Sequence, residues 1–287
     1  MRLVLVLMWL LHWLPLPILG RLGEALGYSL FYLLKKRRHI TLTNLRLCMP
    51  ELSEAERVVL ARRHFQLYAR SVLERGILWW SSERRLNKLI RTPQALPVAQ
   101  MQKQATILLC PHFVSLDVAG IAVMREVTLC SIYTRQSNAV FDEALRKGRS
   151  RFRQNTLVSR AEGVKPIIRA MRSGLPFFML PDMDFGRKDA EFVPFFGVPA
   201  ATLTAVARIA ATTGAQVIPV IATYLPNYQG WQVEYLEPWP NYPGEDILQA
   251  THYMNHFIEQ QISKAPAEYF WAHKRFKTRP EGEASVY

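Results

Sequence analysis

Cysteine is scarce in this sequence, and the signatures of several enzyme classes are missing. The 287 residues include only three cysteines, Cys48, Cys110 and Cys130, without CxxC spacing, which argues against a disulfide scaffold and predicts buried thiols in a reducing compartment. There is no GxSxG nucleophile elbow, no Walker loop and no GxGxxG turn after a strand. A serine nucleophile on such an elbow and a nucleotide cofactor therefore have no support.

A metal site is not expected either. His252 and His256 stand four positions apart on a predicted helix, a spacing that can bind zinc. The glutamate of an HExxH motif, a third ligand and a cysteine pair are all missing. We interpret the two histidines as part of a half-exposed helix face, and we expect no metal and no organic cofactor.

Acidic residues are few in the first third of the chain. Residues 1–100 hold 16 Lys and Arg against 6 Asp and Glu, so most of the formal net charge of +13 lies there. Such a basic region suits nucleic acid, anionic lipid or an acidic protein. Because it adjoins an apolar segment and contains no recognised nucleic-acid-binding module, we expect an anionic membrane surface as partner, and no nucleic acid.

The N-terminal segment is apolar. Residues 3–19 carry no formal charge, and a second apolar stretch follows and stops at the basic run 35–38. A weakly basic start and a poor cleavage site argue against a secretory signal. The length reaches the lower limit of a spanning helix, but Pro15 and Pro17 weaken it, so a spanning anchor, an interfacial anchor and a buried core helix all stay open. The basic flank predicts that the rest of the chain is cytoplasmic.

Beyond this segment, short β-rich runs alternate with helical ones. Ser53 and Glu56 form a capping box that opens a basic helix over 53–80. Strands are predicted at 106–110, 128–133, 155–159, 175–180, 216–224 and 231–238. Helices are predicted near 116–126, 138–150, 163–173, 201–213 and 246–263. This alternation predicts an α/β fold with a mostly parallel sheet flanked by helices.

The chain is accordingly divided into two parts. Residues 1–38 form the membrane anchor with its basic stop, and residues 39–287 form one domain. Within that domain, a basic helical lead-in covers 39–100 and the α/β core covers 101–287.

One histidine stands where functional groups collect in such a fold. His112 follows the predicted strand 106–110 through Pro111, and Asp117 falls in the first turn of the next helix. A carboxylate so placed can orient an imidazole and stabilise its charged form, which makes His112 a candidate general base and Asp117 its partner. The alternative is an ordinary loop histidine beside an aspartate that favours the positive end of a helix.

The segment PHFVSLD, 111–117, resembles the H-x4-D/E motif of the glycerolipid and lysophospholipid acyltransferase superfamily. Further segments resemble its bacterial lipid A late-acyltransferase branch, the Kdo-dependent lauroyl and myristoyl transferases. They are CMPELSEAE at 48–56, YTRQSNAVFDEALRKGRSR at 133–151, LPDMDFGRKDAEFVPFFGVPAAT at 180–202, VIPVIATY at 217–224 and APAEYFWAHKRFKTRP at 265–280. The resemblance implies a glycerolipid-acyltransferase-like sheet and an enzyme of the bacterial inner membrane, with its catalytic domain facing the cytoplasm.

The resemblance also implies a reaction. His112, assisted by Asp117, would deprotonate the hydroxyl of a 3-hydroxyacyl chain on a Kdo-lipid A precursor. That hydroxyl would attack the thioester of an acylated acyl carrier protein, which serves as co-substrate in place of a cofactor. Arg149 and Asp182 correspond to functionally implicated positions of the family. From the residues alone, Arg149 is equally a solvated charge, whereas Asp182 follows the predicted strand 175–180 and should lie near His112 at the same sheet edge.

Basic residues elsewhere are candidate contacts for the acceptor or the acidic carrier protein. Arg135, Arg160 and Lys188 could bind phosphate or sugar-acid groups, and Arg187 and the HKRFK run at 273–277 extend this set. Each is otherwise ordinary surface charge.

Other readings stay open at this point. The phenylalanine-rich stretch 192–200 suits the wall of an acyl-chain channel or plain core packing. The acceptor could instead be a lysophosphatidate or another glycolipid. Two alternatives change the class of protein: a hydrolase and a non-enzymatic membrane adaptor.

Overall fold

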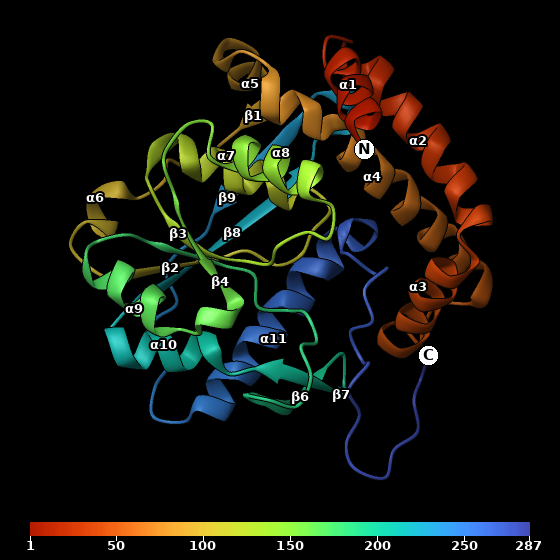
Figure 1. Cartoon of the computed structure of the whole chain (residues 1–287). Helices are drawn as coiled ribbons and strands as arrows, with labels where there is room; N and C mark the ends of the chain where they lie inside the picture. The colour runs from red at the N-terminus through yellow and green to blue at the C-terminus, as the bar shows by residue number, and fades with distance from the viewer.

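A seven-stranded sheet with helices on both faces forms the centre of the computed structural model, which describes residues 1–287 (Figure 1). Its strand order is β1-β9-β8-β2-β5-β3-β4. The strands are β1 (Ile90–Arg91), β2 (Thr106–Leu109), β3 (Cys130–Tyr133), β4 (Thr156–Ser159), β5 (Phe177–Met179), β8 (Gln216–Tyr224) and β9 (Trp231–Tyr235). Only β8 and β9 pair antiparallel; every other neighbouring pair is parallel. The prediction of a mostly parallel sheet flanked by helices is confirmed.

The sheet separates two hydrophobic layers because side chains alternate between its faces. In β2, Ile107 and Leu109 join one cluster of 30 buried residues, while Leu108 joins another of 27. Helices α7 and α8 lie on the side of the second cluster, and α9, α10 and α11 on the side of the first. These helices are α7 (Leu116–Glu126), α8 (Ala139–Arg149), α9 (Lys165–Arg172), α10 (Ala205–Thr213) and α11 (Ile247–Lys264), with two short ones, α5 (Glu83–Leu89) and α6 (Val98–Met101), near β1 and β2.

One hairpin was not predicted. Strands β6 (Ala190–Phe195) and β7 (Val198–Leu203) pair antiparallel through Phe196 and Gly197, whose φ angles of 51° and 75° fit a two-residue hairpin turn. The helix expected from residue 201 therefore starts only at Ala205. Phe195 is fully buried, 6.0 Å from the Tyr269 ring centroid. For this residue the structure favours core packing over an acyl-channel wall.

Four helices precede the sheet and lie along one side of it in Figure 1: α1 (Arg2–Leu11), α2 (Leu16–Leu33), α3 (Lys35–Cys48) and α4 (Glu54–Trp80). The capping box opens α4 as predicted, with Ser53 and Glu56 each bonded to the other's backbone amide. The apolar run 3–19 is split between α1 and α2, because Pro15 and Pro17 begin a new helix. None of the helices is both long and apolar enough to cross a bilayer, so the structure does not support the spanning alternative for the N-terminal segment.

Glycines bring the N-terminal helices into close contact with α4. A Cβ atom on Gly27 would lie 2.3 Å from the Phe65 carbonyl oxygen, and one on Gly23 would lie 2.7 Å from the Arg70 Cα. On α4 itself, a Cβ atom on Gly76 would lie 2.7 Å from the Met8 carbonyl oxygen of α1. These approaches involve backbone atoms that cannot rotate away, so α1 and α2 pack on α4 at backbone contact.

We predict that Gly27→Ala destabilises the protein by roughly 1–3 kcal/mol, because the added methyl group overpacks the α2–α4 contact. Thermal unfolding of the detergent-purified chain measures the effect. Ser29→Ala on the exposed side of α2 is the matched control and should leave the midpoint nearly unchanged. Equal midpoints for Gly27→Ala and the wild type would contradict the close packing.

Candidate active site

His112 and Asp182 meet at the carboxyl edge of the sheet. His112 follows β2 and Asp182 follows β5, and these neighbouring strands are in parallel register with Leu109 opposite Met179. The imidazole Nδ1 of His112 lies 2.6 Å from Oδ1 of Asp182, and the backbone N–H of His112 donates to Oδ2 at 2.9 Å. The predicted proximity of these two strand ends is confirmed.

The carboxylate fixes the imidazole in one tautomer. Burial alone would raise the pKa of the Asp182 carboxyl, but His112 and its hydrogen bonds outweigh this and hold the pKa below its usual range. Asp182 is therefore an acceptor, and Nδ1 of His112 must donate to it. The other ring nitrogen, Nε2, has no partner in the protein and is not enclosed. It is free to accept a proton from a bound hydroxyl group.

Asp117 has different partners from those expected. Its Oδ1 accepts hydrogen bonds from Arg149 Nη2 at 2.7 Å and Nε at 3.1 Å, and its Oδ2 accepts one from Arg75 Nε at 2.8 Å. The prediction that Asp117 orients the His112 ring was wrong: Asp182 occupies that position. The first turn of α7 places Asp117 between α4 and α8, where two guanidinium groups compensate its charge.

The three charges form one partly buried cluster. Burial would raise the pKa of Asp117, but the attraction of Arg149 and Arg75 dominates and holds the pKa far below its usual range. Arg149, at 36% side-chain exposure, turns its remaining N–H groups outward. Arg75 was not predicted as a site residue; the sequence showed it only as one of several basic residues in the predicted helix 53–80. Nothing in the sequence alone distinguishes it from its neighbours.

The predicted substrate contacts lie on the surface. Arg135 follows β3, Arg160 lies in a short 3₁₀ turn after β4, and Lys188 precedes β6; all three are exposed. The guanidinium carbon of Arg160 lies 4.0 Å from the centroid of Phe185, in the loop that follows Asp182. No contact in the structure tests a substrate role for these residues, which stays a prediction.

The HKRFK run is divided between core and surface. Arg275 is buried and donates to the Ala201 carbonyl oxygen at 2.8 Å and to Thr202 Oγ1 at 2.7 Å. It therefore ties the C-terminal segment to β7 and is not available for phosphate. Lys277 is exposed and lies 4.0 Å from the carboxylate of Asp184.

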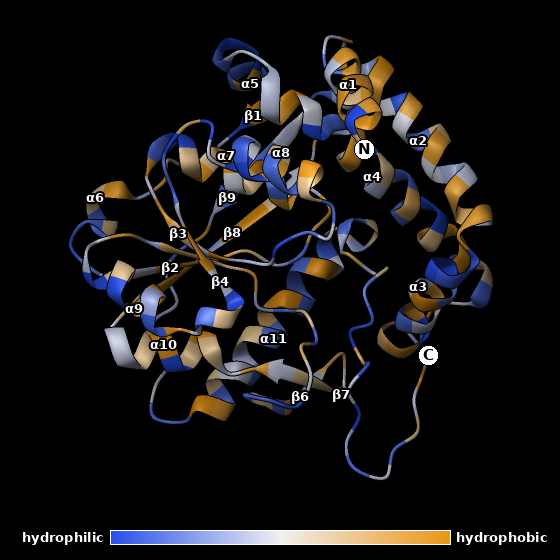
Figure 2. Cartoon of the chain, viewed as in Figure 1, coloured by the Kyte–Doolittle hydropathy of each residue, from blue (hydrophilic) through white to orange (hydrophobic).

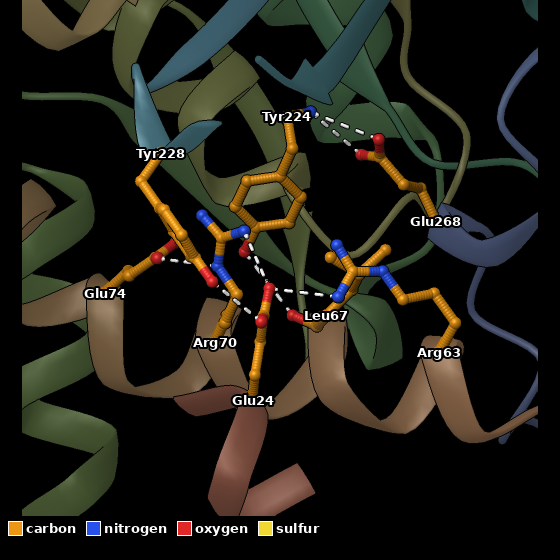
Figure 3. A network of polar contacts seen from close by, with 8 residues as sticks. All are labelled: Glu24, Arg63, Leu67, Arg70, Glu74, Tyr224, Tyr228 and Glu268. Carbon is orange, nitrogen blue, oxygen red and sulfur yellow. Dashed lines mark hydrogen bonds and ion pairs between the residues drawn. The ribbon is translucent and has the colours of Figure 1, made fainter. Parts of the chain in front are cut away.

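A cavity of about 510 Å³ lies beside this site, between α2, α4, the turn after β8 and the end of α11. Figure 3 shows its charged network, in which Glu24 accepts from Arg63 at 3.0 Å and from Tyr228 Oη at 2.8 Å. Arg70 Nε donates to Glu74 Oε1 at 3.0 Å, and the guanidinium carbon of Arg70 is 4.1 Å from the ring centroid of Tyr224. His112 does not line this cavity. Its charged walls make it a poor compartment for a fatty acyl chain.

Glu268 connects the cavity to the His112 loop. Its backbone oxygen accepts from Val114 N–H at 2.8 Å, and its carboxylate accepts from the Tyr224 amide at 3.0 Å and from Ser115 Oγ at 3.4 Å. Burial raises the pKa of Glu268 to about 7. Burial likewise raises the pKa of Glu74 to about 7, despite the opposing attraction of Arg70. Two carboxyl groups behind the site are therefore partly neutral near pH 7.

An imidazole oriented through Nδ1, with Nε2 free, can serve as a general base toward a hydroxyl group or water. Comparison with known proteins specifies the class. The sequence profile of the bacterial lipid A biosynthesis acyltransferase family matches residues 1–278. The chain belongs to this family and is an acyltransferase.

Three characterised relatives come from Escherichia coli strain K12. The lipid A biosynthesis palmitoleoyltransferase and the lipid A biosynthesis lauroyltransferase are each 32% identical to this chain, over 98% of it and 92% of their own length. The lipid A biosynthesis myristoyltransferase is 30% identical over 94% of this chain and 83% of its own. These names specify three different acyl chains, so the likeness does not fix the acyl length.

We predict that Glu268→Gln weakens the pH dependence of stability. Because the pKa of Glu268 is about 7 in the folded protein and near 4.5 when unfolded, its ionisation destabilises the fold as pH rises from 4.5 to 7, by roughly 3 kcal/mol in total. Chemical denaturation at pH 5 and pH 8 should show a smaller decline for Glu268→Gln than for the wild type.

Glu143→Gln, at an exposed position, should retain the wild-type decline. Identical declines in Glu268→Gln and the wild type would rule out a raised pKa for Glu268.

Proposed function

We propose that this chain transfers a fatty acyl group from an acyl carrier protein thioester to a hydroxyl of a 3-hydroxyacyl chain on a Kdo-lipid A precursor, with His112 as the general base. The observation that carries the proposal is the 2.6 Å contact between His112 Nδ1 and Asp182, which leaves Nε2 as the proton acceptor. The three relatives from Escherichia coli are all named as enzymes of lipid A biosynthesis, which supports the acceptor class.

The reaction proceeds by direct transfer. Nε2 of His112 takes the proton as the acceptor oxygen attacks the thioester carbonyl carbon, and the carbonyl electrons move to its oxygen. The tetrahedral intermediate collapses, expels the thiolate and re-forms a carbonyl group as an ester. The thiolate recovers the proton from the His112 imidazolium. Asp182 stabilises that imidazolium throughout, since its own pKa is too low for it to take the proton.

Arg149 supplies a fixed positive charge. Asp117 orients it through two hydrogen bonds to one oxygen and is itself held by Arg75 from α4. In this arrangement the aspartate of the H-x4-D segment serves the arginine, and Asp182 serves the histidine. The outward N–H groups of Arg149 suit an anionic group of the substrate or charge that develops during transfer.

The membrane is proposed to meet the protein at its N-terminal helices. Large apolar side chains of α1, α2 and the turn between them are exposed, including Leu3 (81%), Trp13 (68%) and Leu33 (72%), and the ribbons of both helices are largely coloured as hydrophobic in Figure 2. The basic run 35–38 borders it. Exposed apolar residues beside positive charge support interfacial binding to an anionic bilayer.

We predict that His112→Ala and Asp182→Asn each lower kcat by roughly 10²–10⁴-fold, because one removes the base and the other its orientation. The double variant should lose little more kcat than either single variant, since both substitutions disable the same proton transfer. Asp189→Asn, at an exposed position in the same region, is the control and should stay near wild type. Turnover is measured with purified chain, an acyl carrier protein thioester and a lipid A precursor.

Three outcomes would contradict this assignment. Full activity of His112→Ala would show that His112 is not the general base. Fully additive losses in the double variant would show that Asp182 does not act through His112. Transfer to lysophosphatidate but not to a lipid A precursor would change the acceptor. Release of free fatty acid without any acceptor would indicate a hydrolase.

We predict that Trp13→Glu with Leu33→Glu weakens binding to phosphatidylglycerol-containing vesicles by about tenfold or more, because both side chains leave water for the bilayer interface. Cosedimentation with vesicles measures binding, which should also weaken as salt rises. Val59→Glu is the matched control, since Val59 is similarly exposed (62%) but lies on α4. Unchanged binding of the double variant would exclude this surface.

A further inference from the structure

A second histidine lies next to His112. His273 belongs to the C-terminal segment that runs past the site, where the Phe270 N–H donates to the His112 carbonyl oxygen at 2.9 Å. The backbone of His273 is fixed at both ends: its N–H donates to the Phe270 carbonyl oxygen at 3.3 Å, and its carbonyl oxygen accepts from Asn44 Nδ2 at 2.7 Å. The ring of His273 is therefore held in a defined place.

One loop holds both imidazoles. Asp182 binds the ring of His112, and two residues later the backbone N–H of Asp184 donates to Nε2 of His273 at 3.1 Å. The loop is rigid here, because the fully enclosed Asp184 carboxylate accepts from the Gly186 N–H at 2.9 Å and from the Thr278 N–H at 2.6 Å. The spacing between the rings is thus fixed by two adjacent contacts of the same loop.

The contact with Asp184 fixes the tautomer of His273. A backbone N–H can only donate, so Nε2 must carry a lone pair, and the proton of the neutral ring lies on Nδ1. This Nδ1–H has no acceptor within the protein, and it is not among the polar atoms that are enclosed without a partner. It is a donor that remains available to a bound molecule.

The ring of His273 is neutral near pH 7. Burial and, to a smaller extent, the neighbouring His112 together lower the pKa of His273 to about 4. At neutral pH His273 therefore does not compete for the proton that His112 takes. It stays a neutral donor through the reaction, whereas a charged group there would repel the His112 imidazolium.

We propose that Nδ1–H of His273 donates a hydrogen bond to the carbonyl oxygen of the acyl group and stabilises it as it becomes an oxyanion. The inference deepens the proposed function, because it assigns the oxyanion donor of the same transfer. The electrons that the attacking oxygen pushes onto the carbonyl oxygen meet this donor, and they return when the thiolate leaves. A preorganised neutral donor in a partly enclosed site is the usual means of stabilising such charge.

The test separates the two nitrogens of the ring. His273→Gln places an acceptor near the Nε2 position and keeps the contact with the Asp184 amide, but it removes the Nδ1 donor. His273→Asn retains an N–H near the Nδ1 position and loses the contact with Asp184. We expect His273→Gln to keep its unfolding midpoint and lose roughly 10²–10³-fold in kcat. His273→Asn should lose several degrees in the midpoint and less than tenfold in kcat.

A residue that only supports the fold would not give this crossed pattern. The inference is overturned if His273→Gln keeps kcat within about threefold of wild type, or if His273→Asn loses as much kcat as His273→Gln. Should either variant fail to fold, Nδ1-methylhistidine at position 273 removes the donor alone. It should reproduce the loss seen with glutamine, and full activity of that protein would overturn the proposal.

His112→Ala, assayed beside these variants with the same thioester and lipid A precursor, keeps the two proposals distinguishable. An inactive His112→Ala with fully active His273 variants refutes only the oxyanion donor. An active His112→Ala refutes the proposed function itself.

Discussion

The contact between Asp182 and His112 organises the rest of the site. It depends on β2 and β5 being adjacent and in register, so that the loops after both strands begin at the same height above the sheet. A buried carboxylate is costly unless its oxygens are hydrogen-bonded, and here the backbone amide and the ring of His112 meet that demand together. The hydrogen bonds that compensate the buried charge of Asp182 are therefore the same ones that orient the His112 imidazole.

A second, partly buried carboxylate, Asp117, connects elements that are remote in the sequence. Arg75 lies 42 positions before it and donates to Oδ2, whereas Arg149 lies 32 positions after it and donates to Oδ1. The N-terminal helical part and the sheet domain are therefore joined at the site by a compensated charge cluster as well as by hydrophobic packing. Arg149 gains a fixed orientation from this cluster while keeping part of its surface in the solvent.

The sequence predicted what depends on local pattern. The strands around His112 and Asp182 are short and apolar, so their positions and the meeting of their carboxyl ends could be inferred. The partner of Asp117 could not, because a spacing of five residues does not fix the direction in which the first turn of a helix projects its side chain. Arg75 required knowledge of how α4 docks.

The hairpin β6–β7 was missed for a local reason. Pro194, Pro199 and Gly197 interrupt the residue pattern that normally indicates strands, and the turn relies on positive φ at Phe196, which a bulky residue seldom adopts. For the apolar N-terminal run, length alone left a spanning anchor open; the structure divides the run between two helices at the prolines that already weakened this alternative.

The glycine contacts of α4 have a mechanical consequence. Gly76 abuts the backbone of α1, and the preceding residue, Arg75, grips Asp117. On α4, the contact with the apolar helix α1 and the contact with Asp117, which orients Arg149, are therefore made by consecutive residues. A shift of α1 against α4 would therefore be passed through Arg75 and Asp117 to Arg149, so the packing of the first helix and the orientation of this arginine are mechanically linked.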